Sequence, residues 1–223
     1  MPHFDIVKTS VPSNSFRVSK IQADFDVKQE HAQEHFVGDI VFPESWNIGC
    51  IVGGSGTGKT TIAKELFGNV GGGYKYTAKS VVDDMPPCSV DKITSTFYAV
   101  GFGSVPSWLK PYDVLSNGEK MRVDLARALL EQDFVVFDEF TSVVDRTIAK
   151  TACIAINKAV KRTQKQFVAV SCHYDILEWL CPDWVFDTNT MTSFFGNAHD
   201  LQSNLKSNRV QEVSGQSLGV ITI

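Results

Sequence analysis

The sequence predicts an α/β domain with a mostly parallel sheet and helices on both faces. Short apolar runs typical of buried strands occur at 48–52, 134–137, 167–170 and 184–186. Stretches with apolar residues at helical spacing lie between them, at 61–67, 119–130 and 148–160. Strands that alternate with helices are typical of such a sheet. With 223 residues, the chain is long enough for one domain with a full core.

The N-terminal part predicts an antiparallel layer added to this sheet. Residues 1–15 are polar with two prolines, and we expect them to form an arm. Apolar and polar residues alternate, with one break, over 15–27, and 35–42 is a second apolar stretch, so both predict strands. The charged stretch 28–34 is then a hairpin tip. His31 and His35 lie near this tip, and we interpret them as solvated rather than as metal ligands.

Further elements follow in the order of the chain. Three consecutive glycines at 71–73 end the helix at 61–67. Residues 80–82 predict a short strand, and 89–100 predict a helix capped by Ser89. A helix at 176–180 stops before Pro182. We therefore divide the chain into an N-terminal arm (1–15), one domain (16–196) and a polar C-terminal extension (197–223).

A phosphate-binding loop connects the strand at 48–52 to the helix that follows. Residues 53–60 match G-x-x-x-x-G-K-[ST], in which backbone N–H groups surround phosphates and Lys59 supplies a positive charge. The Thr60 hydroxyl is placed for Mg²⁺. The predicted nucleotide-binding residues of this loop are Gly53, Gly54, Ser55, Gly56, Thr57, Gly58, Lys59, Thr60 and Thr61.

Two carboxylates follow the apolar run at 134–137. This run places Asp138 at the carboxyl end of a central strand, where α/β sheets bind ligands. Asp138 would hold Mg²⁺ through a water molecule, and Glu139 would orient and polarise the water that attacks the phosphate.

The segment 115–119 predicts a helix start that can bind an anion. Ser116 and Glu119 have the spacing of a capping box, and a capped helix N-terminus attracts negative groups.

Four segments resemble the motifs of ABC-type ATPases, in that family's order. Leu-Ser-Asn-Gly-Glu at 115–119 resembles the signature, and 134–139 looks like the Walker B strand with its catalytic glutamate. Residues 142–145 look like the D-loop, and His173 stands where the family has its switch histidine. The resemblance covers roughly residues 17–190. A narrower likeness, at 139–146 and 170–175, is to bacterial and phage ABC-type ATPases often fused to a GNAT-type acetyltransferase domain. The residues that follow are too few for that domain, and an acetyltransferase partner in trans is left open.

The resemblance implies MgATP hydrolysis at the interface of a head-to-tail dimer. Ser116, Gly118 and Glu119 would then contact the nucleotide held by the other subunit, and His173 would contact its γ-phosphate. Asp145 would shape the dimer interface, or else simply cap the helix at 148–160. The family also stacks adenine on an aromatic residue of its N-terminal strands, for which Phe25 is the best match and Phe16 the alternative.

Three departures from the family pattern stand out. Asn117 replaces a glycine, and Glu119 replaces a glutamine. Residues 61–114 contain no glutamine, although the family has a Mg²⁺-sensing one there, so Asp83 or Asp84 is a candidate replacement. This stretch is also short, which predicts a reduced helical subdomain.

Composition narrows the class of protein. The net charge is −4 with scattered basic residues, which argues against non-specific nucleic-acid binding, and no apolar run reaches 18 residues. The start has no signal-peptide pattern. Five cysteines without C-x-x-C spacing indicate free thiols in a reducing cytoplasm rather than a zinc site. We expect a soluble ATPase acting on a protein or nucleic-acid partner; the alternatives are an ABC transporter subunit and a regulatory nucleotide-binding module with little turnover.

Overall fold

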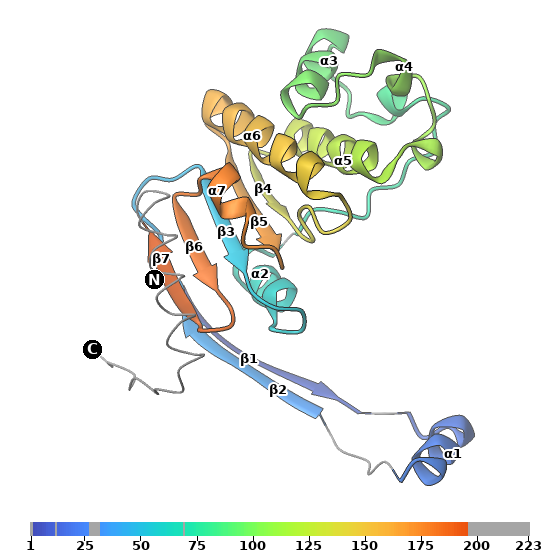
Figure 1. The fold of residues 1–223 in the computed structure, drawn as a ribbon, viewed down its shortest axis with the longest axis vertical. Helices are drawn as coiled ribbons and strands as arrows, with labels where there is room; N and C mark the ends of the chain where they lie inside the picture. Colours follow the sequence, from blue (N-terminus) through green and yellow to red (C-terminus); the bar gives the residue numbers. More distant parts are fainter. Residues whose placement is uncertain (1, 12, 27–31, 69, 196–223) are drawn as a thin grey trace.

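The computed structural model describes residues 2–11, 13–26, 32–68 and 70–195. Its centre is a five-stranded sheet of order β4-β5-β3-β6-β7 (Figure 1). The strands are β3 (Ile48–Val52), β4 (Phe134–Phe137), β5 (Gln166–Ser171), β6 (Trp184–Asp187) and β7 (Thr192–Phe195). Strands β4, β5, β3 and β6 are parallel, and β7 pairs antiparallel with β6. The predicted α/β class with a mostly parallel sheet is therefore confirmed.

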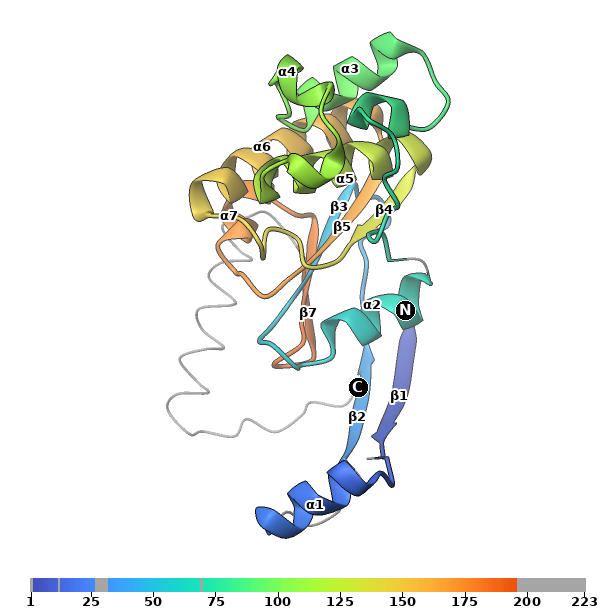
Figure 2. The same cartoon turned by 90° about the vertical axis from the view of Figure 1, so that its right-hand side faces the viewer.

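Helices cover both faces of this sheet. Helix α2 (Lys59–Phe67) lies on one face, and α5 (Asn117–Glu131) and α6 (Arg146–Thr163) lie on the other (Figures 1 and 2). Successive residues of β3 point to opposite faces, so Cys50 packs in the cluster under α5 and α6 while Ile51 packs in the cluster under α2. A strand buried on both faces is apolar throughout, which explains the run at 48–52.

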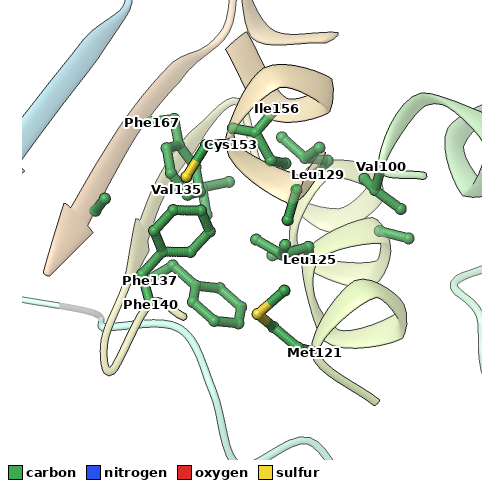
Figure 3. Close-up of a cluster of buried hydrophobic side chains, with 14 of the residues drawn as sticks. Val100, Met121, Leu125, Leu129, Val135, Phe137, Phe140, Cys153, Ile156 and Phe167 are labelled. Carbon is green, nitrogen blue, oxygen red and sulfur yellow. The ribbon is translucent and has the colours of Figure 1, made fainter. Parts of the chain in front are cut away.

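The larger apolar cluster joins α5 and α6 to β4 and β5 (Figure 3). Met121, Leu125 and Leu129 are four residues apart and form one stripe of α5, as the sequence predicts. Side chains from the neighbouring elements meet this stripe: Val135, Phe137, Phe140, Cys153, Ile156 and Phe167. Burying each large apolar side chain contributes roughly 1.5–3 kcal/mol, so this cluster fixes α5 relative to the sheet.

A small helical lobe lies beyond α5. It contains α3 (Val90–Ala99), α4 (Val105–Trp108) and two 3₁₀ turns, η1 (Val81–Asp84) and η2 (Tyr112–Val114). Ser89 caps α3 by accepting a hydrogen bond from the Lys92 backbone N–H, as predicted. The strand predicted at 80–82 is wrong, because Ser80 is the N-cap of η1 and this turn begins at Val81. The Asp84 carboxylate closes the turn by accepting from the Thr77 and Ala78 backbone N–H groups.

The N-terminal antiparallel layer is present, but other residues build it. Strand β1 (His3–Ser10) pairs with β2 (Ala32–Asp39) from His3 opposite Asp39 to Ser10 opposite Ala32. Residues 3–10, which the sequence assigned to a polar arm, thus form a strand. Phe4 anchors it, since this ring is buried and packs edge-on against Phe186 at 5.8 Å between centroids.

The strand predicted over 15–27 is wrong, because this stretch contains helix α1 (Phe16–Asp24). Its apolar residues at 18, 21 and 25 fit helical spacing as well as alternation, and Ser15 caps it by accepting from the Val18 backbone N–H. Both views show α1 at the outer end of the β1–β2 ribbon, away from the sheet (Figures 1 and 2). Most of the predicted hairpin tip, with His31, and the extension 197–223 lie outside the described residues.

Helix α7 (Ile176–Leu180) connects β5 to β6, close to the prediction for 176–180. In the described part of the chain, no helix is long and apolar enough to cross a membrane.

Candidate nucleotide site

The phosphate-binding loop lies between the carboxyl end of β3 and the first turn of α2. Gly58 has φ of 84° and lies so close to Phe36 that an added Cβ would be 2.6 Å from the ring. Only glycine avoids both the strained backbone and this contact. The loop is thus held against β2 by a packed aromatic ring.

A polar network behind the loop holds it from the other side. Thr188 follows β6, and its hydroxyl lies 2.5 Å from the Thr57 hydroxyl. The Asn189 side-chain oxygen accepts from the Gly54 backbone N–H at 3.1 Å. Sequence reasoning missed both residues. The one available signal was their position directly after a predicted core strand, since such strand ends meet at one edge of the sheet.

The same network reaches the segment after His173. The Tyr174 hydroxyl donates to the buried Asp187 carboxylate at 2.9 Å and accepts from the Asn189 side-chain amide at 3.0 Å. Residues after β5 and after β6 are thereby tied to the phosphate-binding loop.

A hollow of about 270 Å³, here the P-loop hollow, opens in front of the loop. It is lined by Lys8, Glu34, Ser55, Gly56, Gly58, Lys59, Thr60, Thr61 and Glu139. Lys59 is nearly buried, and its ammonium donates to the Gly54 carbonyl at 2.5 Å. The structure therefore brings the predicted lysine, the predicted Thr60 and the predicted catalytic carboxylate Glu139 to one cavity.

Two further residues of the hollow come from the ribbon and were not predicted. Lys8 of β1 and Glu34 of β2 are directly opposite each other across the ribbon. The sequence offered no signal for them, because 1–15 was interpreted as an arm and 28–34 as a hairpin tip. Only the pairing of β1 with β2 places them at the loop.

Asp138 and Glu139 come directly after β4. The Asp138 carboxylate accepts from the Glu139 backbone N–H at 2.9 Å, and Glu139 has a positive φ of 51°. The turn rejoins the sheet where the Phe140 N–H donates to the Val170 carbonyl. This sharp turn directs Glu139 into the P-loop hollow.

The oxygen atoms of Thr60, Asp138 and Glu139 are the donor type that Mg²⁺ prefers. Among the described residues, no three His, Cys, Asp or Glu side chains cluster closely enough to hold a metal by themselves. Mg²⁺ usually keeps phosphate and water oxygens among its ligands, and the magnesium site at Thr60 and Asp138 stays a prediction.

His173 lies at the carboxyl end of β5, the strand between β3 and β4. Its backbone N–H donates to the Ser171 hydroxyl at 3.1 Å. The sheet order thus places the histidine segment between the loop after β3 and the carboxylates after β4.

An unpredicted ion pair connects the segment after His173 to the predicted D-loop. The Arg146 guanidinium makes two hydrogen bonds to the Asp175 carboxylate, one of them 2.7 Å from Nε to Oδ2. Asp145 itself is the N-cap of α6 and accepts from the Thr147 and Ile148 N–H groups. Its capping role is thus visible in one chain, and its role at a dimer interface stays a prediction.

The predicted signature begins α5 with the expected capping box. The Ser116 backbone N–H and hydroxyl donate to Glu119, whose backbone N–H donates back to the Ser116 hydroxyl. A hydrogen bond from Ser107, and then that from the Ser116 N–H, holds the pKa of Glu119 below its usual value. Glu119 therefore stays ionised, and its hydrogen bonds with Ser116 stabilise the start of this helix.

Ser116 and Gly118 do not line the P-loop hollow of their own chain. A second cavity of about 280 Å³, here the signature hollow, lies between the signature and Walker B segments. Asn117 and Lys120 line one side of it and Asp138 the other, and Glu139 lines both hollows. A single chain thus brings only part of the predicted site together.

A tyrosine cluster supports the back of the signature hollow. The Asp124 carboxylate accepts from the Tyr76 hydroxyl at 2.7 Å and from the Tyr112 hydroxyl at 2.9 Å. Burial raises the pKa of Asp124, while these two hydrogen bonds oppose that rise. The two tyrosine rings stack at 3.9 Å, so the segment after the triple glycine is fastened to α5.

Phe25 does not line the P-loop hollow, and adenine stacking on this residue stays a prediction. It is the C-cap of α1 and 74% exposed, and the alternative Phe16 is 82% exposed on the same helix. That prediction assumed a strand at 15–27, whereas this stretch contains the helix α1. No residue that lines the P-loop hollow is aromatic. Asp83 and Asp84 also line neither hollow; Gly72 does line the signature hollow.

Comparison with solved structures identifies the fold. The cbiO1 protein of Clostridium perfringens, part of the ABC transporter complex cbiONQ, superposes with a TM-score of 0.58. The alignment covers 94% of this chain and 95% of that chain at 16% identity. The chain has the fold of an ATP-binding cassette.

Two other solved structures share this cassette fold. One is a dimer of the cassette MJ0796 in a post-hydrolysis state with ADP and Pi (TM-score 0.57, 13% identity, 83% of this chain and 92% of that chain). The other is the archaeal ribosome recycling factor aABCE1 in complex with the ribosomal stalk protein aP1. It superposes with a TM-score of 0.53 at 21% identity, and the alignment covers 68% of this chain and 38% of that chain. No family model matches the chain, and no curated protein matches it.

Proposed function

We propose that this chain is a soluble ATPase that binds and hydrolyses MgATP between two head-to-tail copies, and that closure of the dimer acts on a macromolecular partner. The observation that supports this most is the P-loop hollow, where Lys59, Thr60 and Glu139 line one cavity. A bare glycine-rich turn needs neither a buried lysine nor a carboxylate opposite it.

The residues have separate tasks in this proposal. Lys59 and the loop N–H groups bind the β- and γ-phosphates, and Lys59 exchanges its contact with the Gly54 carbonyl for a phosphate oxygen. Thr60 and Asp138 would hold Mg²⁺, which neutralises developing charge on the phosphates. Glu139 orients the attacking water and accepts its proton. His173 contacts the γ-phosphate from the neighbouring strand.

A second copy is needed because the signature lies outside the hollow of its own chain. Ser116 and Gly118 are at the capped start of α5, where Ser116 is exposed and Gly118 is buried, and the helix dipole there attracts an anion. Two copies related by a two-fold axis would each offer this helix start to the nucleotide of the other. Dimers are known among the neighbours, since MJ0796 was solved as one.

A transporter subunit is the second candidate, because cbiO1 belongs to a transporter complex and covers nearly the whole chain. The short helical lobe and the absence of glutamine from 61–114 favour the first candidate. The likeness to aABCE1, which was solved with a protein partner, is compatible with a macromolecular target. The resemblance to acetyltransferase-fused ATPases of bacteria and phages stays a prediction.

Replacing Glu139 with Gln tests the proposed chemistry. The amide keeps the shape of the side chain but cannot accept a proton, so we expect ATP binding to be kept and phosphate release to fall about a hundredfold or more. Steady-state phosphate release and calorimetric ATP binding measure the two effects. Glu44→Gln, at an exposed carboxylate outside the hollow, is the control. Normal turnover in Glu139→Gln would contradict the assignment.

A further inference from the structure

Residues of α3 and α6 line a groove. Both helices lie on the side of the sheet opposite α2 (Figures 1 and 2). It consists of two adjoining hollows of about 380 Å³ and about 170 Å³, which share Ala99, Ala159 and Arg162. No residue of the groove lines the P-loop hollow or the signature hollow. It is therefore a separate surface, and an occupant would leave the nucleotide site open.

The shape of the groove suits a helix. Its α6 wall runs from Thr151 to Thr163 in steps of three and four residues, a length of roughly 18 Å at the rise of an α-helix. Small side chains such as Ala99 and Ala155 form much of its floor, and small residues let another backbone approach closely. The exposed Tyr98 and Ile154 stand at its sides, 57% and 39% exposed. Such a surface accepts the apolar face of about three helical turns.

The rim of the groove is basic. Helix α6 contains five basic residues and no acidic one, in a chain whose net charge is −4. Four basic residues line the groove: Lys92, Lys158, Arg162 and Lys165. No acidic residue lines it, although Asp133 pairs with Lys165 from outside at 2.7 Å. Among the described residues, Lys158 and Arg162 have no carboxylate within ion-pair distance.

We propose that the groove binds an acidic amphipathic helix of a partner protein, with apolar side chains on the floor and carboxylates beside Lys158 and Arg162. The exposed helix of this chain, α1, does not complement it, since α1 carries two basic residues and one acidic residue. The extension 197–223 has as many basic as acidic residues, so it does not complement the basic groove either. A nucleic acid would match the charge but leave the apolar floor unused. The inference rests on the proposed function only in that this helix belongs to the partner on which the ATPase acts.

The test uses the full chain and a fluorescein-labelled peptide of about 12 residues, with Leu along one helical face and Glu on the other. We expect saturable binding by anisotropy without nucleotide. The double variant Lys158→Glu, Arg162→Glu should weaken it about tenfold or more, because attraction becomes repulsion. Lys161→Glu changes an exposed charge on the same helix outside the groove, and it should alter binding less than about twofold. Circular dichroism confirms that each variant is folded.

Three outcomes would overturn the proposal. The first is the absence of peptide binding, or an equal loss of peptide affinity in the double variant and in Lys161→Glu. The second is equal binding of a peptide in which Ser replaces every Leu, since the apolar floor would then have no role. The third is that the double variant loses binding of a single-stranded DNA oligonucleotide but keeps binding of the peptide. ATP hydrolysis is measured on the same samples. Hydrolysis without peptide binding would refute the proposed role of the groove but not the proposed ATPase function. Peptide binding without hydrolysis would refute the ATPase function but not the role of the groove.

Discussion

At the scale of single residues, burial separates two lysines that face the same cavity. Lys59 is nearly buried at the start of α2, whereas Lys8 is an exposed residue of the β1–β2 ribbon. A charge in a less hydrated place interacts more strongly with a bound anion than one in open solvent. The two residues therefore make unequal contributions to binding a phosphate, although both line one hollow.

Lys59→Ala and Lys8→Ala measure this difference. Loss of Lys59 removes a charge-assisted contact of roughly 1.5–3 kcal/mol, so ATP affinity should fall about ten- to a hundredfold. Loss of Lys8 should cost about two- to fivefold at low salt and almost nothing at 0.5 M salt, because exposed charges are screened. Calorimetry at two salt concentrations provides both values. Equal losses in the two variants would show that burial does not decide the contribution.

At the scale of elements, the turns after neighbouring strands act together. The turn after β5 carries His173 and Asp175, and the turn after β4 leads through the predicted D-loop to Arg146 at the start of α6. The Arg146–Asp175 pair joins these turns, and the Arg146 guanidinium also lies 5.4 Å above the Trp179 ring. A planar guanidinium can bridge both oxygens of a carboxylate and stack on a ring, which an ammonium group cannot do.

Arg146→Lys should therefore loosen the link between the two turns without touching the phosphates. We expect the turnover number to fall about three- to tenfold, with calorimetric ATP affinity within about twofold of the unchanged protein. Arg17→Lys serves as the control, because Arg17 is an exposed residue of α1 that lines neither hollow and forms none of the described ion pairs. A change in ATP affinity as large as the change in turnover would show that the pair shapes the phosphate site itself.

At the scale of the whole molecule, the predicted site is divided between two places. The predicted phosphate-binding loop lies at the end of β3, and the predicted signature lies at the start of α5 (Figure 1). A nucleotide that binds the dimer better than the monomer must shift the equilibrium toward the dimer. Assembly is thus expected to depend on ATP.

Light scattering of Glu139→Gln tests the assembly. With ATP and Mg²⁺ this variant should be a dimer, and without nucleotide largely a monomer. Adding Ser116→Arg should restore the monomer, because a bulky side chain would block the capped helix start from the opposite nucleotide. Turnover per unmutated chain should rise with protein concentration. A monomer under all conditions, with turnover independent of concentration, would exclude the dimer mechanism but leave the phosphate-binding loop assignment intact.

The sequence by itself predicted the elements whose signals are local. The strand at 48–52, the glycine loop after it, the stripe of α5 and the capping serines at 89 and 116 all depend on near neighbours in the chain. The spacing of apolar residues within one helix or strand depends only on that short segment. The parallel sheet is then predicted from the alternation of strands and helices along the chain. The carboxylate Glu139 could be predicted for the same reason, as it directly follows a buried strand.

Only the tertiary structure decided which distant segments meet. Residues 16–24 fit two periodicities, and the helix is favoured by its Ser15 cap and by the pairing of β2 with β1 instead. That pairing brought Lys8 and Glu34, and not Phe25, to the P-loop hollow. Thr188 and Asn189 reach the loop because β6 is the neighbour of β3 in the sheet. Strand order and pairing are set by contacts between residues far apart in the chain, such as His3 with Asp39 and Gly49 with Trp184, which no local pattern records.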